Sequence, residues 1–245
     1  MRFVLEVKDK RIAFVGECLK NDGNEVVEFS SSIGSLGKGD ICVVSPAHKW
    51  NSAEVEQVKN ADLCLGGKID DALFNKFKKY VNMLCDEDFA MKNAMLTAEA
   101  TISEIFRTTE KSLHDMKILI LGSGRISKSL WKIFDGLGVE FDVAMRNEKE
   151  RILSQIVAKH SLRLENISLQ DYDLIINTIP AKLFDADSLI GLKDNHCIIE
   201  LASIPCIDFT EGINFVLCGG LPGKILCKSA GKVVLNKLLE EIKKI

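Results

Sequence analysis

The sequence predicts an α/β protein of two domains, each built on a doubly wound parallel sheet, with a linking helix between them. Short apolar runs, typical of buried parallel strands, alternate with helical segments in both halves of the 245 residues. Between the halves, Asp88–Glu110 carries apolar residues at helical spacing. We therefore place an N-terminal α/β domain at residues 1–87, the linking helix at 88–112, the second domain at 113–228, and a C-terminal helix, packed back on the first domain, at 229–245.

Composition and charge limit the possible functions. Hydrophobic residues make up 47% of the chain and charged residues 27%, as in ordinary globular proteins. The net charge of −3 creates no field that would attract nucleic acid. The first six residues reach a charge too early for a secretion signal, and no apolar run approaches the roughly 18 residues of a membrane span. We expect a cytoplasmic protein with neither a membrane nor a nucleic-acid partner.

The eight cysteines and four histidines show no metal-binding or disulfide pattern. No C-x-x-C pair occurs, and Cys42, Cys64 and Cys197 lie in apolar, strand-like runs. We expect reduced thiols that pack as small hydrophobic side chains, and no metal site.

Short apolar runs predict the strands of the first domain: Arg11–Val15, Glu25–Phe29, Ile41–Val44, Asp62–Leu65 and Tyr80–Leu84. Two segments between them, Ala53–Lys59 and Asp71–Lys79, have helical composition. The Ser- and Gly-rich segment Ser30–Asp40 predicts a surface loop.

The second domain begins with the buried-strand run Lys117–Leu121, followed by a glycine turn and an amphipathic helix at Lys128–Leu137. The remaining segments alternate in the same way. The predicted strands are Phe141–Met145, Asp173–Asn177, Cys197–Leu201 and Phe215–Leu217, and the predicted helices are Glu148–His160 and Ser229–Lys244.

The glycine turn is a dinucleotide-binding fingerprint in the context that it requires, after a strand and before a helix. Gly122 permits the tight turn, Gly124 lets the backbone approach a pyrophosphate, and the helix N-terminus attracts that anion. Ser127 replaces the third glycine, whose role is close helix packing. The alternative is a Rossmann fold that has lost its ligand. We predict a Rossmann domain with cofactor contacts at Gly122, Ser123, Gly124, Arg125 and Ile126.

The end of the second strand of this domain favours NADP as the cofactor. NAD sites place an acidic residue there for the ribose 2′-hydroxyl, whereas NADP sites favour a cation. Asp142 lies too early in the strand and is expected to point into solvent, while Arg146 and Asn147 fall where a 2′-phosphate would lie. The alternatives are NAD as the cofactor and an Arg146 that only caps a surface loop.

Further loops follow strands at the same edge of the predicted sheet, where open α/β sheets bind ligands. They add to the predicted cofactor contacts Asn177, Thr178, Pro180, Ala202 and Ser203. Beyond them, three glycines and a proline surround Lys224, and Lys228 would share its face if the region is helical. Both lysines are candidates for anion binding; the alternative is that they are solvated surface residues.

Together these segments resemble the family of the A subunit of dipicolinate synthase. Four of them occur in that family's order and spacing: Gly122–Arg125, Asn177–Pro180, Glu200–Ser203 and Gly220–Lys224. Two more are similar to family segments, Thr97–Ala100 and Lys228–Gly231. The likeness covers residues 86–245. The family's Gly-Gly-Asp-x-Arg opening is matched only by Val15-Gly16-Glu17-Cys18.

The resemblance implies a protein that works with a flavoprotein-like B subunit, in the cytosol of a cell that forms endospores. Together they would oxidise a dihydrodipicolinate-type compound to dipicolinate (pyridine-2,6-dicarboxylate), with NAD(P)⁺ as hydride acceptor. The first domain would lie on the substrate side, and a homo-oligomer is expected.

Roles for four residues follow from this expected chemistry. A substrate with two carboxylates needs cations, which Lys224 and Lys228 would supply, and Thr97 would donate to a carboxylate. Glu99 would remove the ring proton; the alternative is a solvated helix position. We thus predict Glu99 and Lys224 as catalytic residues and Thr97 and Lys228 as substrate-binding residues.

Other functions compete with this interpretation. A 2-hydroxyacid dehydrogenase would need an arginine after the fifth Rossmann strand and a later glutamate–histidine pair, but the chain has no arginine after Arg163 and no histidine after His196. A different small acid could be the substrate of another Rossmann oxidoreductase. A non-catalytic NAD(P)-binding protein, with a regulatory or partner role, would need the glycine turn but not the lysine loop at Gly220–Lys224.

Overall fold

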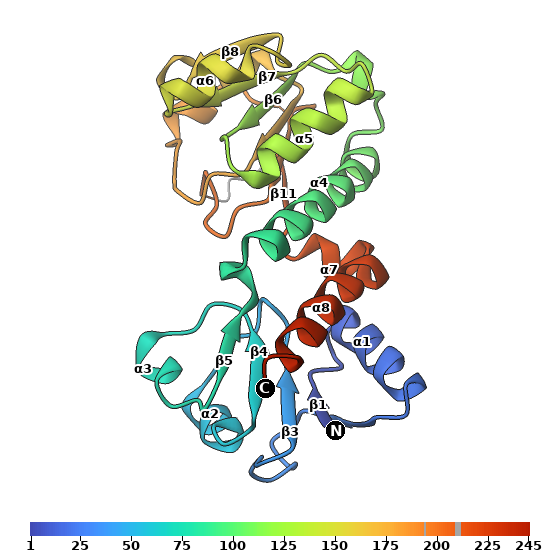
Figure 1. The fold of residues 1–245 in the computed structure, drawn as a ribbon. Coiled ribbons are helices and arrows are strands. Elements are labelled where there is room, and N and C mark those ends of the chain that lie inside the picture. The colour runs from blue at the N-terminus through green and yellow to red at the C-terminus, as the bar shows by residue number, and fades with distance from the viewer. Residues whose placement is uncertain (194, 209–211) are drawn as a thin grey trace. The chain divides into compact units, whose positions relative to one another are not determined.

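The structure is a computed structural model that describes residues 1–193, 195–208 and 212–245. The chain folds into two units (Figure 1). Unit 1 comprises Met1–Leu96 together with Pro222–Ile245, and unit 2 comprises Thr97–Leu221. Each unit holds its own parallel sheet, as the alternation of strands and helices predicted.

The sheet of unit 1 has the strand order β2-β1-β3-β4-β5, with every neighbouring pair parallel. The strands are β1 (Arg2–Leu5), β2 (Glu25–Glu28), β3 (Asp40–Val43), β4 (Leu63–Gly66) and β5 (Tyr80–Asn82). The helices that follow them are α1 (Lys10–Asn21), α2 (Ser52–Val58) and α3 (Asp71–Phe74). Because β1 lies between β2 and β3, the order reverses between β1 and β3, as in doubly wound sheets.

The predicted strand at Arg11–Val15 is wrong, because this segment lies in α1. The strand is the preceding run, β1, whose last three residues are buried. Asp9 starts the helix by accepting a hydrogen bond from the Arg11 backbone N–H. Ile12, Val15 and Leu19 then recur at helical spacing and face the core.

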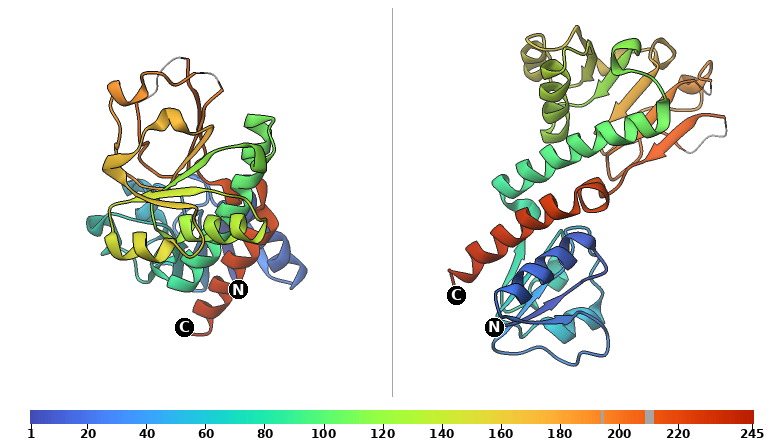
Figure 2. Two further views of the ribbon diagram at one scale, coloured as in Figure 1. Left: turned by 90° about the horizontal axis from the view of Figure 1, so that it is seen from above. Right: turned by 90° about the vertical axis from the view of Figure 1, so that its right-hand side faces the viewer.

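The C-terminal helix packs back on the first domain, as predicted. It runs as α8 (Cys227–Ile242), preceded by the short α7 (Leu221–Ile225), and lies alongside α1 (Figure 2). A Cβ added at Gly231 would lie 2.6 Å from the Phe14 ring and 2.8 Å from the Arg11 carbonyl oxygen, so this glycine permits the close approach of α8 and α1. The predicted second domain extended to residue 228, whereas unit 1 takes over at Pro222 because α7 and α8 pack against α1.

The linking helix is α4 (Glu87–Thr109), close to the predicted Asp88–Glu110. Its residues divide between the units, with Leu96 in unit 1 and Thr97 in unit 2. Short 3-10 helices lie in the connections of the described chain: η1 (Met83–Cys85), η2 (Leu113–Asp115), η3 (Leu164–Asn166), η4 (Leu169–Asp171) and η5 (Asp187–Leu189).

The sheet of unit 2 has the order β11-β10-β9-β6-β7-β8, again with parallel neighbours. Its strands are β6 (Ile118–Leu121), β7 (Asp142–Met145), β8 (His160–Arg163), β9 (Leu174–Asn177), β10 (Cys197–Glu200) and β11 (Asn214–Leu217). Its helices are α5 (Arg125–Gly136) and α6 (Glu148–Ser154). Numbered within the unit, the order is 3-2-1-4-5-6, which is that of a Rossmann domain.

One strand of this sheet was not predicted from the sequence. The predicted helix Glu148–His160 ends at Ser154, and His160 begins β8 instead. Since β8 is an edge strand whose terminal residues are exposed, it lacks the apolar run by which buried strands are recognised.

The buried thiols fit the prediction. Cys42, Cys64 and Cys197 are free cysteines buried in β3, β4 and β10. Within the described ranges, no helix combines the length and the apolar character that a membrane span requires.

Candidate dinucleotide-binding site

The predicted cofactor contacts of unit 2 gather at the carboxyl ends of β6, β7, β9 and β10. Strands β6 and β9 are neighbours in the sheet although β7 follows β6 in the chain, so the order reverses between them. Open α/β sheets bind ligands at such a reversal, because the loops after the two strands diverge and leave a crevice.

Gly122, directly after β6, is required by both conformation and space. Its φ of 108° lies in a region that side chains rarely adopt. A Cβ there would lie 2.5 Å from the Thr178 hydroxyl and 3.0 Å from Cγ1 of Ile179, both in the loop after β9. The glycine therefore lets the two loops at the reversal touch.

Ser127, which replaces the third glycine of the fingerprint, stabilises this contact. It is fully buried, and its hydroxyl lies 2.7 Å from the Thr178 hydroxyl. The Thr178 hydroxyl donates to the Leu121 carbonyl at 2.8 Å, so its single proton is used and it accepts from Ser127. The serine thus joins α5 to the ends of β6 and β9.

Gly124 forms the N-cap of α5, and its surroundings fit a pyrophosphate. No side chain caps the first turn of the helix, and a Cβ added at Gly124 would meet no atom within 4 Å. Unpaired backbone N–H groups and the helix dipole favour an anion at such a position. The neighbouring predicted contacts, Ser123, Arg125 and Ile126, lie in the same turn and are half-buried or exposed.

The loops after β9 and β10 are joined by a buried carboxylate. The amide nitrogen of Asn177 donates to both oxygens of Glu200, at 2.8 and 2.9 Å, and both side chains are buried. Backbone N–H groups of Ala202 and Cys206 also donate to Glu200, each at 2.8 Å. The bonds satisfy the carboxylate fully, so Asn177 and Ala202 shape the edge of the site through Glu200.

Glu200 itself was not singled out from the sequence as a functional residue. The signal was present, since Glu200 is a charged residue at the end of the otherwise apolar strand Cys197–Glu200. Pro180 and Ser203, in the same two loops, are exposed.

Arg146 and Asn147 follow β7, as predicted, and differ in how free they are. Arg146 is exposed, and no ion pair joins it to another described residue. Asn147 is the N-cap of α6, where its side-chain oxygen accepts from the Glu150 backbone at 3.1 Å. Of these two side chains, it is therefore Arg146 that offers uncommitted donors at this end of β7.

Asp142 does not point into solvent, contrary to the prediction. Its carboxylate lies 2.9 Å from Nδ1 of His160 and accepts from the Tyr172 hydroxyl at 2.9 Å. Asp142 begins β7 and so lies at the amino edge of the sheet, opposite the glycine turn.

The four predicted substrate residues belong to different units. Thr97, buried, and Glu99, exposed, lie on the unit 2 part of α4. Lys224 and Lys228 lie in unit 1 and are both exposed. The two lysines do not share one helix, because α7 ends at Ile225 and α8 begins at Cys227.

Gly223, beside Lys224, has a structural role. A Cβ at this position would lie 2.6 Å from Nε of Arg11. The Arg11 side chain is buried beneath it, donates to both oxygens of Asp9 at 3.0 and 2.8 Å, and donates to the Ser45 hydroxyl at 3.0 Å. Burial alone raises the pKa of Asp9, but the bonds and charge of Arg11 lower it overall.

The sequence prediction missed this arginine because it matched the family's opening motif to a different segment. Val15–Cys18 lies inside α1, far from any strand end. Asp9-Lys10-Arg11 instead supplies the Asp-x-Arg, between β1 and α1.

No protein-family model matches the chain. The chain is 32% identical over 176 residues to the A subunit of dipicolinate synthase of Bacillus subtilis (strain 168), and the alignment covers 67% of this chain but only 59% of that protein. The crystal structure of the dipicolinate synthase A chain from Bacillus subtilis matches with a TM-score of 0.79 at 20% identity, over 99% of this chain and 96% of the other. An L-alanine dehydrogenase matches with a TM-score of 0.68 at 14% identity, over 99% and 89%.

The strand orders, the glycine turn and these structural matches define a two-domain protein with the Rossmann-type dehydrogenase fold. Within that class, the chain belongs to the family of the dipicolinate synthase A subunit. The predicted resemblance is confirmed by sequence over two thirds of the chain and by fold over nearly all of it.

Proposed function

We propose that this chain is an A-type subunit of dipicolinate synthase that binds NADP in unit 2 and oxidises a dihydrodipicolinate-type compound to dipicolinate. The observation that supports the proposal most is the turn at Gly122–Gly124, which opens an uncapped helix N-terminus at the reversal of a Rossmann-ordered sheet. The relative of known name is one subunit of its enzyme, so we also propose that activity requires a B subunit, in the cytosol of a spore-forming cell.

In this proposal the backbone N–H groups that follow Gly124 bind the pyrophosphate, and Arg146 binds the 2′-phosphate. Arg146 supports NADP over NAD because it is a guanidinium with no ion-pair partner among the described residues at the end of β7. The nicotinamide, when bound, supplies the hydride acceptor.

The remaining steps fall to the side chains. Lys224 and Lys228 bind the two carboxylates of the substrate, Thr97 donates a hydrogen bond to one of them, and Glu99 takes the ring proton as hydride leaves. Loss of a hydride and a proton makes the ring aromatic, so correct positioning is the main requirement placed on these residues.

The test is turnover of enzymatically generated dihydrodipicolinate with NADP⁺, measured as NADPH absorbance and dipicolinate formation, with and without a candidate B subunit. Turnover with B present, faster with NADP⁺ than with NAD⁺, is the expected result. NADP binding with no dipicolinate formed, even beside an active B subunit, would contradict the proposal.

One observation favours a second function, that of a non-catalytic NADP-binding partner. Gly223 packs on Arg11 and Gly231 on Phe14, so two glycines around the exposed lysines already have structural roles. If the lysine loop is only structural, NADP binding survives in Lys224 and Lys228 variants and the chain contributes regulation rather than chemistry.

A further inference from the structure

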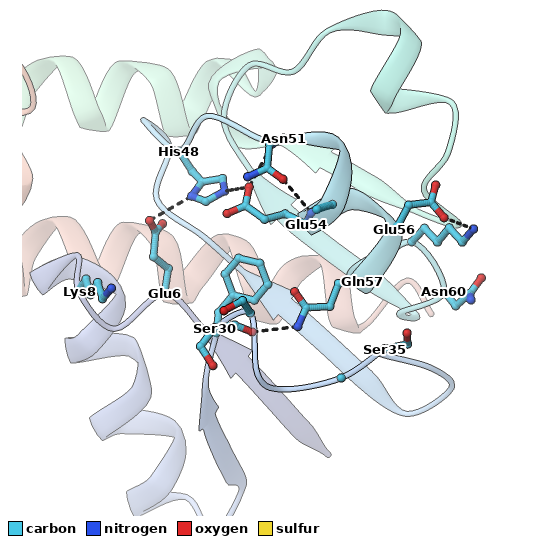
Figure 3. Close-up of a pocket in the computed structure, with 15 residues that line it drawn as sticks. Glu6, Lys8, Ser30, Ser35, His48, Asn51, Glu54, Glu56, Gln57 and Asn60 are labelled. Atoms are coloured by element: carbon cyan, nitrogen blue, oxygen red, sulfur yellow. Dashed lines mark hydrogen bonds and ion pairs between the residues drawn. The ribbon is translucent and has the colours of Figure 1, made fainter.

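Unit 1 contains a cavity of about 860 Å³ that none of the predicted site residues lines. Its walls come from the segments after β1, β2 and β3 and from α2, all within unit 1 (Figure 3). Strand β1 lies between β2 and β3, so the cavity sits at the carboxyl edge where the order of this sheet reverses. Its volume is within the range of about 300–1,000 Å³ usual for small-molecule sites.

His48 is the buried polar group in the cavity wall. Its side chain is only 10% exposed, and Nδ1 lies 3.0 Å from a Glu6 oxygen. Nε2 lies 3.4 Å from Glu54 Oε2 but makes no hydrogen bond within the described part of the chain. Burial alone lowers the pKa of His48, but the bond to Glu6 and the charges of Glu6 and Glu54 raise it overall.

Each of the two carboxylates is held in place by a backbone N–H. Glu6 Oε2 accepts from Ser45 at 2.7 Å, and Glu54 Oε2 accepts from Asn51 at 3.0 Å as part of the capping box of α2. Glu54 Oε1 has no hydrogen-bond partner among the residues that the structure describes. The side chains therefore cannot swing away, and one oxygen is left to accept a bond from a ligand.

The charges around His48 do not balance. Glu6 and Glu54 carry two negative charges against one positive charge on a protonated His48. The other acidic group of the wall, Glu56, is neutralised by Lys59 at 2.5 Å and by Lys76 at 3.5 Å. The excess is one negative charge beside the imidazole, a position that favours a cation.

The opposite charge lies at a different point of the wall. Lys8, two residues after Glu6, is exposed, and no ion pair links it to another described residue. Neutral groups of Ser30, Gln57 and Asn60 line the remaining wall, and Gln57 is already engaged with the Ser30 carbonyl at 2.8 Å.

We propose that this cavity binds a small zwitterion of the amino-acid class, with its ammonium group against Glu54 and its carboxylate against Lys8. The excess negative charge at Glu6 and Glu54 selects against a dicarboxylate, so this site is separate from the one that binds the dicarboxylate substrate. The inference does not depend on the proposed function of the chain.

Three related probes separate the two charges of the ligand. L-Glutamine carries both, N-acetyl-L-glutamine lacks the ammonium group and L-glutaminamide lacks the carboxylate. The readout is the imidazole NMR signal of His48, assigned among the four histidines by its loss in His48→Gln. We expect a saturable shift with L-glutamine and affinity at least about tenfold weaker for each of the other two probes, since each loses a charge-assisted hydrogen bond.

Two variants assign the contacts. Glu54→Gln keeps the capping box, since glutamine also serves there, but should weaken L-glutamine binding at least about tenfold. Glu17→Gln makes the same chemical change on the exposed face of α1 and should leave binding unchanged. Lys8→Met should weaken L-glutamine but not L-glutaminamide.

Three results would each overturn the proposal: no saturable shift of the His48 signal at 50 mM L-glutamine, about the highest concentration at which weak specific binding is still meaningful; equal affinity for N-acetyl-L-glutamine; or wild-type affinity in both Glu54→Gln and Lys8→Met.

Discussion

The carboxyl edges of the two sheets are built in opposite ways. In unit 2, the edge is formed by backbone: Gly122 and Gly124 create the space, and the buried Glu200 is satisfied by Asn177 and backbone N–H groups. In unit 1, the same edge carries charged side chains that face a cavity, with His48 between Glu6 and Glu54. A backbone site leaves a local glycine pattern in the sequence, whereas a side-chain site is assembled from segments far apart in the chain.

The largest effect should come from breaking the backbone edge at Gly122. Gly122→Ala places a Cβ 2.5 Å from the Thr178 hydroxyl in a conformation that side chains rarely adopt, and should destabilise unit 2 by about 3–4 kcal/mol. In Gly138→Ala, where φ is also positive but no atom lies within 4 Å, the cost should be about 1 kcal/mol. Denaturation followed by Trp131 fluorescence in a Trp50→Phe background reports on unit 2 alone. Equal losses would show that the contact between the loops is unimportant.

The second effect tests whether the side chains of unit 1 take part in the chemistry. Lys224→Met should leave NADP affinity nearly intact but reduce dicarboxylate turnover by at least about a hundredfold, as expected for a lost charge-assisted contact. Lys232→Met, an exposed lysine of α8, is the control. Near-normal kcat/KM for Lys224→Met beside an active B subunit would make the lysine loop structural.

The third effect tests the one charged contact predicted at the backbone edge. Arg146→Ala should weaken NADP by about 1.5–3 kcal/mol and leave NAD almost unchanged, because only NADP carries the 2′-phosphate. Lys149→Ala removes a nearby exposed charge as a control. If calorimetry gives equal losses for both nucleotides in Arg146→Ala, the arginine does not select NADP.

The smallest effect concerns pH and belongs to unit 1 alone. Because the pKa of His48 is raised above its ordinary value of 6.5, the protonated ring stabilises unit 1 fully below about pH 6.5, and this contribution is lost as pH rises through the folded-state pKa. The stability difference between wild type and His48→Gln should therefore shrink with rising pH. Trp50 fluorescence in a Trp131→Phe background measures it, with the exposed His114→Gln as control; a pH-independent difference would contradict the assignment.

The same contrast explains what could be predicted from the sequence. The turn at Gly122–Ser127 was recognisable because its spacing is local, and buried strands such as β6 because every residue is apolar. β1 and α1 were confused because Arg11–Val15 is a short apolar run that periodicity alone cannot assign to strand or helix. The Asp9–Arg11 pair and the cluster of Glu6, His48 and Glu54 could not be found, because only the fold brings β1, β3 and α2 together.

The dinucleotide site at Gly124 is the central claim, and one variant tests it directly. Gly124→Asp adds a side chain where no atom lies within 4 Å, at a φ of −77° and at an N-cap position where aspartate is a preferred residue. Unit 2 should therefore melt at or above the wild-type temperature, while the carboxylate occupies the pyrophosphate position and NADPH binding, measured by calorimetry, disappears. Unchanged NADPH affinity in a folded Gly124→Asp protein would show that the glycine turn is not a dinucleotide site.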